Sequence, residues 1–114
     1  MVLNGEKLEA NILKKMQERI IKNFMGIIIM SELRRGPLSG YDVISYIQTK
    51  FGLLISSGTV YSLLYSLERN ELVEGVWNER KRTYKLTEKG EKTIETIMNA
   101  HEKIKGFMAN LLKE

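Results

Sequence analysis

The sequence predicts a mainly α-helical fold that carries one small β-hairpin. Three observations support this prediction. Apolar residues recur at steps of three and four along most of the chain, which is the spacing of helices with one buried face. A stretch near position 80 instead alternates between polar and apolar residues around a charged turn, which is typical of two paired strands. After that stretch, an apolar stripe at helical spacing predicts one long C-terminal helix.

The first predicted helix runs from Leu8 to Leu33. Its apolar residues at helical spacing are Leu8, Ile12, Leu13, Met16, Ile20, Ile21, Phe24, Ile27, Ile28 and Leu33. The segment 26–30, Gly-Ile-Ile-Ile-Met, is apolar all round, so we expect it to be buried on every side. Gly36-Pro37 ends the helix, because proline disfavours a helical conformation in the residue before it.

A hydroxyl side chain marks the start of the second predicted helix. Ser39 is placed to cap it, and Asp42 three residues later completes a capping box. The inward residues are Val43, Ile44 and Ile47, and the helix is expected to stop near Phe51-Gly52. The next residues, 53–55, fit either a short strand or a plain extended connection.

The third predicted helix begins at a second pair of hydroxyl residues. Ser56 or Ser57 caps it, and Asn70 is expected to end it. Its inward stripe consists of Val60, Leu63, Leu64 and Leu67. Its other face carries serine, threonine, tyrosine and arginine instead of the lysine and glutamate common on solvated helices. Such a face suits close approach to another molecule.

Two strands follow, Leu72–Asn78 and Arg82–Leu86, joined by a charged turn. In the second strand, residues 83 and 85 are expected to face one way and residues 84 and 86 the other. Trp77 is expected to pack against Tyr84 within this hairpin. Thr87 then caps the last predicted helix, which reaches Leu112, and Glu88 in its first turn favours the helix N-terminus.

Three helices closed by a two-stranded hairpin make the winged helix-turn-helix arrangement. The predicted order is helix, helix, strand, helix, strand, strand, helix. We therefore expect residues 1–86 to form a winged helix-turn-helix DNA-binding domain and residues 87–114 to form a C-terminal dimerisation helix. In this fold the third helix, residues 56–70, enters the DNA major groove.

The composition of the 114 residues narrows the functional classes. Cysteine is absent from the sequence, which rules out disulfides and thiolate chemistry, and one histidine is too few for an ordinary transition-metal site. The sequence also has no glycine-rich phosphate loop and no nucleophile–base pair, so we expect no enzyme, no cofactor and no metal. The N-terminus does not read as a secretory signal, and the apolar run at 24–30 is too short to span a membrane. We expect a cytoplasmic protein.

Charge and side-chain chemistry favour DNA as the partner. The net charge is +4, and basic residues outnumber acidic ones between positions 34 and 85. Short hydroxyl side chains at a helix N-terminus suit phosphate oxygens and allow approach to base edges, and a cationic hairpin tip suits the DNA backbone. The candidate DNA contacts are Tyr41, Ser57, Thr59, Tyr61, Ser62, Tyr65, Arg69, Arg80, Lys81 and Arg82.

The apolar stripe of the last helix predicts a partner helix. The stripe is too long to be buried on one small domain, so we expect it to pair with a second copy of the chain. The candidate dimerisation residues are Ile94, Ile97, Met98, His101, Ile104, Met108 and Leu111. A homodimer of this kind would bind a pseudo-palindromic operator.

Three motifs together resemble the PadR family of transcriptional regulators. They are Gly-Pro-x-x-Gly-Tyr from Gly36, Gly-Thr-x-Tyr-x-x-Leu from Gly58, and Arg-x-Tyr-x-Leu-Thr-x-x-Gly from Arg82. The resemblance implies a homodimeric winged-helix DNA-binding protein, usually a repressor, whose C-terminal helix packs on the partner's first helix. Chain length matches the short members of the family.

Some short members of that family bind flat aromatic compounds through a tryptophan on the last helix. This chain has no tryptophan there, so a small-molecule effector stays unassigned. Two other functional classes stay open on the sequence: a winged-helix protein–protein interaction module without DNA binding, and a small enzyme. Basic residues on the third helix and in the hairpin argue against the first, and the missing catalytic groups argue against the second.

Overall fold

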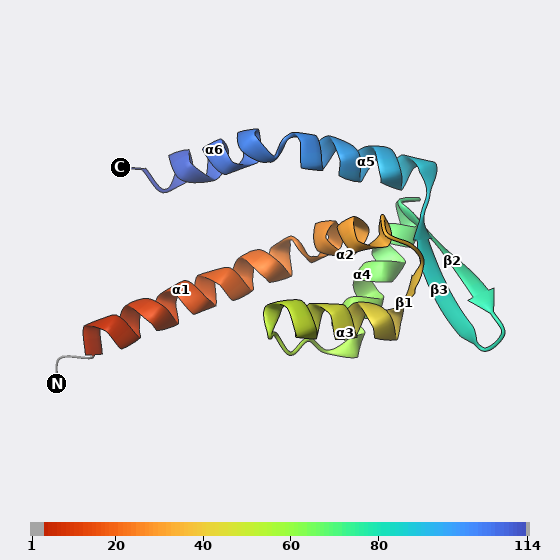
Figure 1. The fold of residues 1–114 in the computed structure, drawn as a ribbon, viewed down its shortest axis with the longest axis horizontal. Coiled ribbons are helices and arrows are strands. Elements are labelled where there is room, and N and C mark those ends of the chain that lie inside the picture. The colour runs from red at the N-terminus through yellow and green to blue at the C-terminus, as the bar shows by residue number, and fades with distance from the viewer. Residues whose placement is uncertain (1–3, 114) are drawn as a thin grey trace.

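The structure, a computed structural model, describes residues 4–113. Figure 1 shows its nine elements in chain order. They are α1 (Asn4–Asn23), α2 (Met25–Leu33), β1 (Leu38–Ser39), α3 (Gly40–Phe51), α4 (Ser57–Arg69), β2 (Val73–Asn78), β3 (Lys81–Leu86), α5 (Glu88–Asn99) and α6 (His101–Leu111). The predicted mainly helical fold with a small wing is confirmed. Residues 1–3 and 114 of the two expected domains lie outside the described residues.

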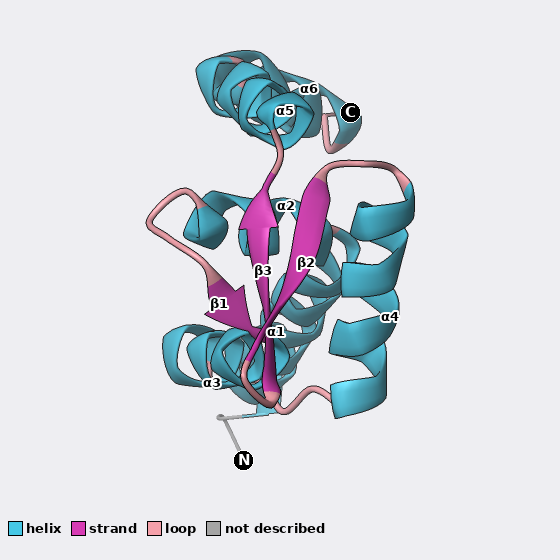
Figure 2. Cartoon of the chain, turned by 90° about the vertical axis from the view of Figure 1, so that its right-hand side faces the viewer, coloured by secondary structure: helices cyan, strands magenta, loops and turns pink. Residues whose placement is uncertain are grey.

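The sheet has three antiparallel strands in the order β1-β3-β2, which lie side by side in Figure 2. In the hairpin, Val73 pairs with Leu86 and Asn78 with Lys81. This confirms the predicted hairpin and extends its second strand by one residue. A short strand was considered at residues 53–55, but the third strand lies before α3, where Leu38 pairs with Tyr84. Residues 53–55 are an extended connection and belong to no strand.

One hydrophobic core joins α2, α3, α4, α5 and the wing. Its fully buried side chains include Met25, Ile29, Ile47, Val60, Leu64, Val73, Tyr84 and Ile94. In the segment 26–30, which was expected to be buried on every side, Ile29 and Met30 are buried and residues 26–28 are half-buried. The inward residues predicted for α3 and α4 lie in or against this core. Ile94 was predicted at a dimer interface. That prediction is wrong, because the side chain is fully enclosed by its own chain.

The predicted helix caps are present. Ser39 Oγ accepts a hydrogen bond from Asp42 N, and Asp42 Oδ2 accepts one from Ser39 N, each at 3.1 Å, so the capping box is complete. Ser56 caps α4 and Thr87 caps α5. Asn70 is the C-terminal cap of α4. These local signals place α3, α4 and α5 within one residue of their expected starts.

The first and last helices are bent, where the sequence predicts continuous ones. The bends lie at Phe24 and Ala100. Each of these residues is a turn at which one helix ends and the next begins: Phe24 N donates to the Ile20 oxygen (2.9 Å) and the Phe24 oxygen accepts from Ile28 N (2.9 Å), while the Ala100 oxygen accepts from Ile104 N (3.0 Å). At each bend the helix passes from the packed body to an exposed arm. We attribute the bends to packing, which fixes the direction of α2 and α5 and leaves α1 and α6 unconstrained.

The two arms, α1 and α6, extend from the body on the same side (Figure 1). They give the chain an elongated shape with extents of 58 × 31 × 21 Å. None of the helices within residues 4–113 is both long and apolar enough to cross a membrane. The same part of the chain holds no group of three or more histidine, aspartate or glutamate side chains placed to hold a metal ion.

Candidate nucleic-acid interface

The outward face of α4 carries short hydroxyl groups along its first turns. Ser57, Thr59 and Ser62 are exposed, as are Tyr65 and Arg69 further along. Each of these residues was predicted on this face. The cap residue Ser56 accepts a hydrogen bond from Thr59 N at 3.2 Å, and the two hydroxyl oxygens lie 2.8 Å apart. Thr59 is thereby held at the N-terminus of α4, where backbone N–H groups lack helical partners.

A shallow pocket of about 320 Å³ lies beside α4, between the start of α3 and the wing. We call it the tyrosine pocket. It is lined by Ser39, Tyr41, Tyr61, Tyr65, Trp77, Arg80, Lys81, Arg82 and Tyr84. Six of the ten predicted DNA contacts therefore meet in one place, although they come from three separate segments of the chain. The other four, Ser57, Thr59, Ser62 and Arg69, lie on α4 outside it.

Gly40 fixes the position of the Tyr61 ring. A Cβ atom on Gly40 would overlap the ring and would lie 2.7 Å from its hydroxyl oxygen. The Tyr61 ring therefore lies directly over the backbone at the start of α3, and its centroid is 6.3 Å from that of Tyr65. Tyr41, the next residue after Gly40, is 71% exposed. The glycine thus brings tyrosines of two helices to one surface.

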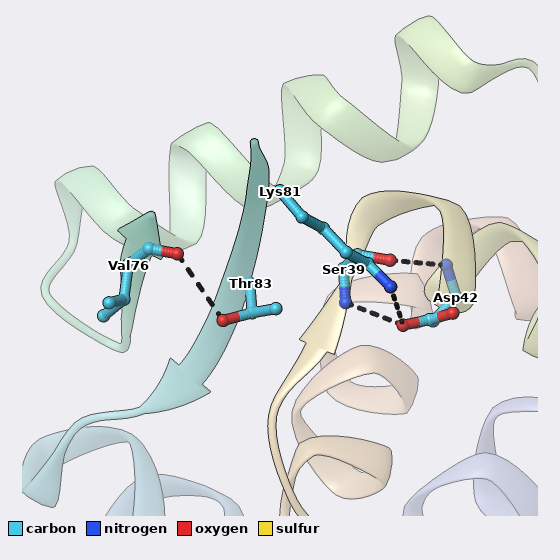
Figure 3. A network of polar contacts seen from close by, with 5 residues as sticks. All are labelled: Ser39, Asp42, Val76, Lys81 and Thr83. Carbon is cyan, nitrogen blue, oxygen red and sulfur yellow. Dashed lines mark hydrogen bonds and ion pairs between the residues drawn. The ribbon is translucent and has the colours of Figure 1, made fainter. Parts of the chain in front are cut away.

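The tip of the wing is a tight turn of two residues, Glu79 and Arg80. Lys81, which was expected in the turn, is instead the first residue of β3, next to Arg82. Lys81 Nζ lies 3.7 Å from Asp42 Oδ2, and Figure 3 shows this ion pair beside the capping box of α3. Backbone and side-chain hydrogen bonds from Ser39, with a smaller contribution from Lys81, hold the pKa of Asp42 below its usual value of 3.8.

Arg82 differs from its neighbours, because its side chain turns back towards α4. Its Nη2 donates to Glu68 Oε2 at 2.7 Å, and its guanidinium lies over the rings of Trp77 and Tyr84. The expected packing of Trp77 on Tyr84 is therefore replaced by packing of both on Arg82, and Trp77 stays 68% exposed. Burial raises the pKa of the Tyr84 phenol. Glu68 was not among the predicted site residues, since only the fold brings it to Arg82.

A second surface lies on the two arms. No side chain of α6 is buried, and most of α1 is exposed. Side chains of both helices line an apolar hollow of about 410 Å³: Leu13, Met16, Gln17, Ile20, Met108, Leu111 and Leu112. The apolar face of α1 was not assigned to an interface from the residues alone, although its helical stripe is visible in the sequence.

The predicted dimerisation residues are divided between the body and this surface. Met98 packs against the core, and Ile97 is half-buried, whereas Ile104 and Leu111 are exposed. His101 is exposed and pairs locally: its Nδ1 lies 3.0 Å from the Met98 carbonyl oxygen and its Nε2 lies 3.2 Å from Glu102.

Solved structures with this fold include several transcriptional regulators. A transcriptional regulator from Clostridium thermocellum is 26% identical, with a TM-score of 0.72 over 83% of this chain and 96% of that one. A PadR family transcriptional regulator from Eggerthella lenta is 20% identical, with a TM-score of 0.75 over 94% of this chain and 97% of that one.

Bacillus subtilis PadR has been solved in complex with operator DNA and in complex with p-coumaric acid. In the DNA complex it is 25% identical to this chain, with a TM-score of 0.57 over 65% of this chain and 46% of that one. A search of curated protein sequences found no match. The model of the transcriptional regulator PadR-like family matches residues 29–96, which span α2 to α5 apart from the first residues of α2 and the last of α5. This chain therefore belongs to the PadR-like family of transcriptional regulators.

Proposed function

We propose that this regulator is a sequence-specific double-stranded DNA-binding protein that acts as a homodimeric repressor. The observation that carries the proposal is the tyrosine pocket beside the hydroxyl face of α4. Four tyrosines, of which only Tyr84 is buried, meet there with two exposed cations, Arg80 and Lys81. Phenol hydroxyls and cations are donors to phosphate oxygens. The pocket is thus suited to a DNA backbone that passes beside a helix in the major groove.

The two parts of this surface would have different tasks. Thr59 and Ser62 project from the first half of α4 with short side chains, so the helix can enter the groove and reach base edges. The wing tip, with Arg80 and Lys81, would meet phosphates. Phosphate contacts set affinity and register, whereas base contacts set sequence preference.

Relatives support this assignment. Bacillus subtilis PadR has been solved in complex with operator DNA and is similar to this chain over 65% of its length. The match to the family model includes α4 and the wing. A DNA-binding regulator works where DNA is, so we infer a cytoplasmic protein that regulates genes and is not an enzyme. This chain covers 42% of the Bacillus subtilis PadR chain that was solved with p-coumaric acid, so we assign no effector.

The homodimer is proposed from the arms. We assign DNA binding to residues 1–86 and dimerisation chiefly to residues 87–114, with α1 contributing the facing surface. Since α5 packs on the body, the free part of the C-terminal segment begins at Ala100. Two recognition helices related by a two-fold axis would address half-sites about 34 Å apart on a pseudo-palindrome.

The test is a salt titration of DNA binding. Purified protein is titrated onto duplex DNA from upstream of its own gene, and onto a scrambled duplex, at several salt concentrations between 50 and 300 mM. We expect tighter binding to the upstream DNA and a linear fall of log K with log salt, because each neutralised phosphate releases condensed counterions. Affinity that does not change with salt contradicts the proposal and favours a protein partner for this face.

A further inference from the structure

We propose that Glu68 and Arg82 hold the wing at a fixed angle to α4 and that Arg82 is a positioning residue which does not contact DNA. This inference deepens the proposed function and depends on it for its effect on DNA affinity. It also changes the role that the sequence suggested for Arg82, which was counted among the basic residues of an exposed tip.

One carboxylate oxygen joins the three elements of the DNA-binding surface. Glu68 Oε2, on α4, accepts a hydrogen bond from Arg82 Nη2 of β3 at 2.7 Å and one from the backbone N–H of Gly75 of β2 at 3.0 Å. Both strands of the wing are thereby attached to the last turns of the recognition helix. Hydrogen bonds between charged groups are about twice as strong as neutral ones.

Gly75 provides the space for this contact. A Cβ atom at position 75 would lie 2.6 Å from Arg82 Nη2 and 2.8 Å from Arg82 Cζ. Any other residue would displace the guanidinium from Glu68. In the register of the hairpin, Gly75 pairs with Tyr84 and Trp77 pairs with Arg82, so these residues occupy neighbouring positions on the two strands.

The guanidinium is enclosed by aromatic rings. Arg82 Cζ lies 5.5 Å from the ring centroid of Tyr84 and 6.0 Å from that of Trp77. Its Nε is buried and has no hydrogen-bond partner within residues 4–113. The side chain is 32% exposed, and its guanidinium is engaged by the Glu68 carboxylate. An arginine held in this way is poorly placed to reach a phosphate.

The angle of the wing decides where its tip lies. Arg80 forms no ion pair within residues 4–113, and Lys81 pairs only with Asp42, across 3.7 Å at an exposed site. Exposed pairs of this kind contribute little to stability. The Lys81–Asp42 pair joins the wing to α3, whereas the shorter and less exposed contact through Glu68 joins it to α4 and fixes the tip cations relative to Thr59 and Ser62.

The experiment is a double-mutant cycle on Glu68→Ala and Arg82→Ala, read by operator affinity and by its salt dependence. We expect each single variant to weaken operator binding roughly tenfold. The double variant should be no weaker than either single one, because both remove the same contact. The salt slope should stay at the wild-type value in all three, since no phosphate contact is lost.

Two controls sharpen the cycle. Arg80→Ala removes a cation that we place against phosphate, so it should lower the salt slope by about one. Glu74→Ala removes an exposed acidic group of β2 and should leave operator binding unchanged or slightly tighter. If Glu68→Ala instead tightens binding while Arg82→Ala lowers the salt slope by about one, Arg82 contacts phosphate and the inference is overturned.

A readout without DNA keeps this inference separate from the proposed function. Trp77 is the one tryptophan of the chain and lies over the Arg82 guanidinium. We expect both single alanine variants to shift its fluorescence emission, and the milder Arg82→Lys and Glu68→Gln variants to shift it less. Emission that is unchanged in folded alanine variants overturns the inference. If the wild type binds no DNA but the emission shifts as expected, the wing contact stands and only the proposed function fails.

Discussion

The backbone of Gly90, in the first turn of α5, lies directly against the carbonyl oxygen of Leu72, where α4 passes into the wing. The same oxygen accepts a hydrogen bond from Thr87 N at 3.1 Å. Thr87 Oγ1 donates to the Glu71 carbonyl oxygen at 2.6 Å and accepts from Gly90 N at 3.0 Å. The start of α5 is therefore attached to the turn between α4 and β2, and this contact sets the direction in which the C-terminal arm leaves the body.

Gly90→Ala is expected to destabilise the protein. A methyl group at position 90 overlaps the Leu72 oxygen and lies 3.2 Å from Leu86 Cδ2, so backbone must move. We expect a loss of about 1–3 kcal/mol in the free energy of unfolding, measured by urea denaturation. Gly58→Ala is the matched control, because a Cβ there meets nothing within 4 Å. That variant should be unchanged or more stable by up to about 1 kcal/mol. Equal stability of the two variants would contradict the contact.

In the Asp42→Asn variant, the free energy of unfolding is expected to depend less on pH in the acid range. The pKa of Asp42 is lowered in the folded state by its hydrogen bonds to Ser39, so between that pKa and 3.8 the unfolded chain binds more protons. The stability that the carboxylate contributes is present above pH 3.8 and is lost as the pH falls through the folded pKa. Urea denaturation at pH 7, 4 and 2.5 measures it.

Wild type should exceed Asp42→Asn in stability at pH 7, and this advantage should shrink as the pH falls below 3.8. Ser39→Ala removes the other half of the capping box, whose hydroxyl does not titrate, and should cost about 1 kcal/mol at neutral pH and remain destabilising at pH 2.5. A difference between wild type and Asp42→Asn that does not vary with pH would show that the carboxylate is not stabilised by these bonds.

The parts of this fold that the sequence predicts correctly depend on local signals. Ser39 with Asp42, Ser56 and Thr87 each cap a helix through residues three positions away, so the pattern is legible in a short window. The bend at Phe24 has no such signal, because the apolar spacing of the sequence continues through it unchanged. It depends on which part of the helix meets the body.

Long-range contacts account for the errors at the site. The two-residue strand at Leu38 exists only because β3, more than forty residues later, pairs with it. Arg82 is separated from Glu68 by 14 residues, and nothing in the charge run around Arg82 distinguishes it from Arg80. Ile94 continues the apolar stripe of the arm in sequence but lies on the body in space. The spacing of apolar residues predicts that one face of a helix is buried, but not whether its own chain or a partner chain covers that face.

Ser62→Ala and Lys81→Ala are expected to separate base recognition from backbone binding. Ser62 is exposed on α4, where we propose that short side chains reach base edges, so its loss should change preference among operator variants by about 1 kcal/mol at one base step. Lys81→Ala should weaken operator and scrambled DNA alike and lower the salt slope by about one. Salt titrations of both variants on both duplexes measure this. The reverse pattern would exchange the two roles, and no change in either variant would place DNA elsewhere.

Leu13→Glu and Leu111→Glu are expected to convert a dimer into a folded monomer. The two side chains are 55% and 63% exposed, yet both line the apolar hollow between α1 and α6. Large exposed apolar surfaces on soluble proteins mark interaction sites, and a glutamate in a buried contact leaves an unpaired charge. Sedimentation velocity should give a wild-type mass near twice the chain mass of 13.2 kDa and a mass near 13.2 kDa for each variant.

Leu13 and Leu111 lie outside the hydrophobic core, so their substitution tests the interface and leaves the core intact. Met98→Glu would be a poor choice, because Met98 packs against the core of its own chain and the variant would fail to fold. Leu54→Glu is the control: Leu54 is 87% exposed in the connection between α3 and α4 and does not line the apolar hollow, so that variant should remain a dimer. Circular dichroism checks that all three variants keep their helices. If Leu13→Glu and Leu111→Glu both remain dimers, the arms are not the interface; if wild type sediments as a monomer, the proposed two-fold arrangement on DNA has no basis in solution.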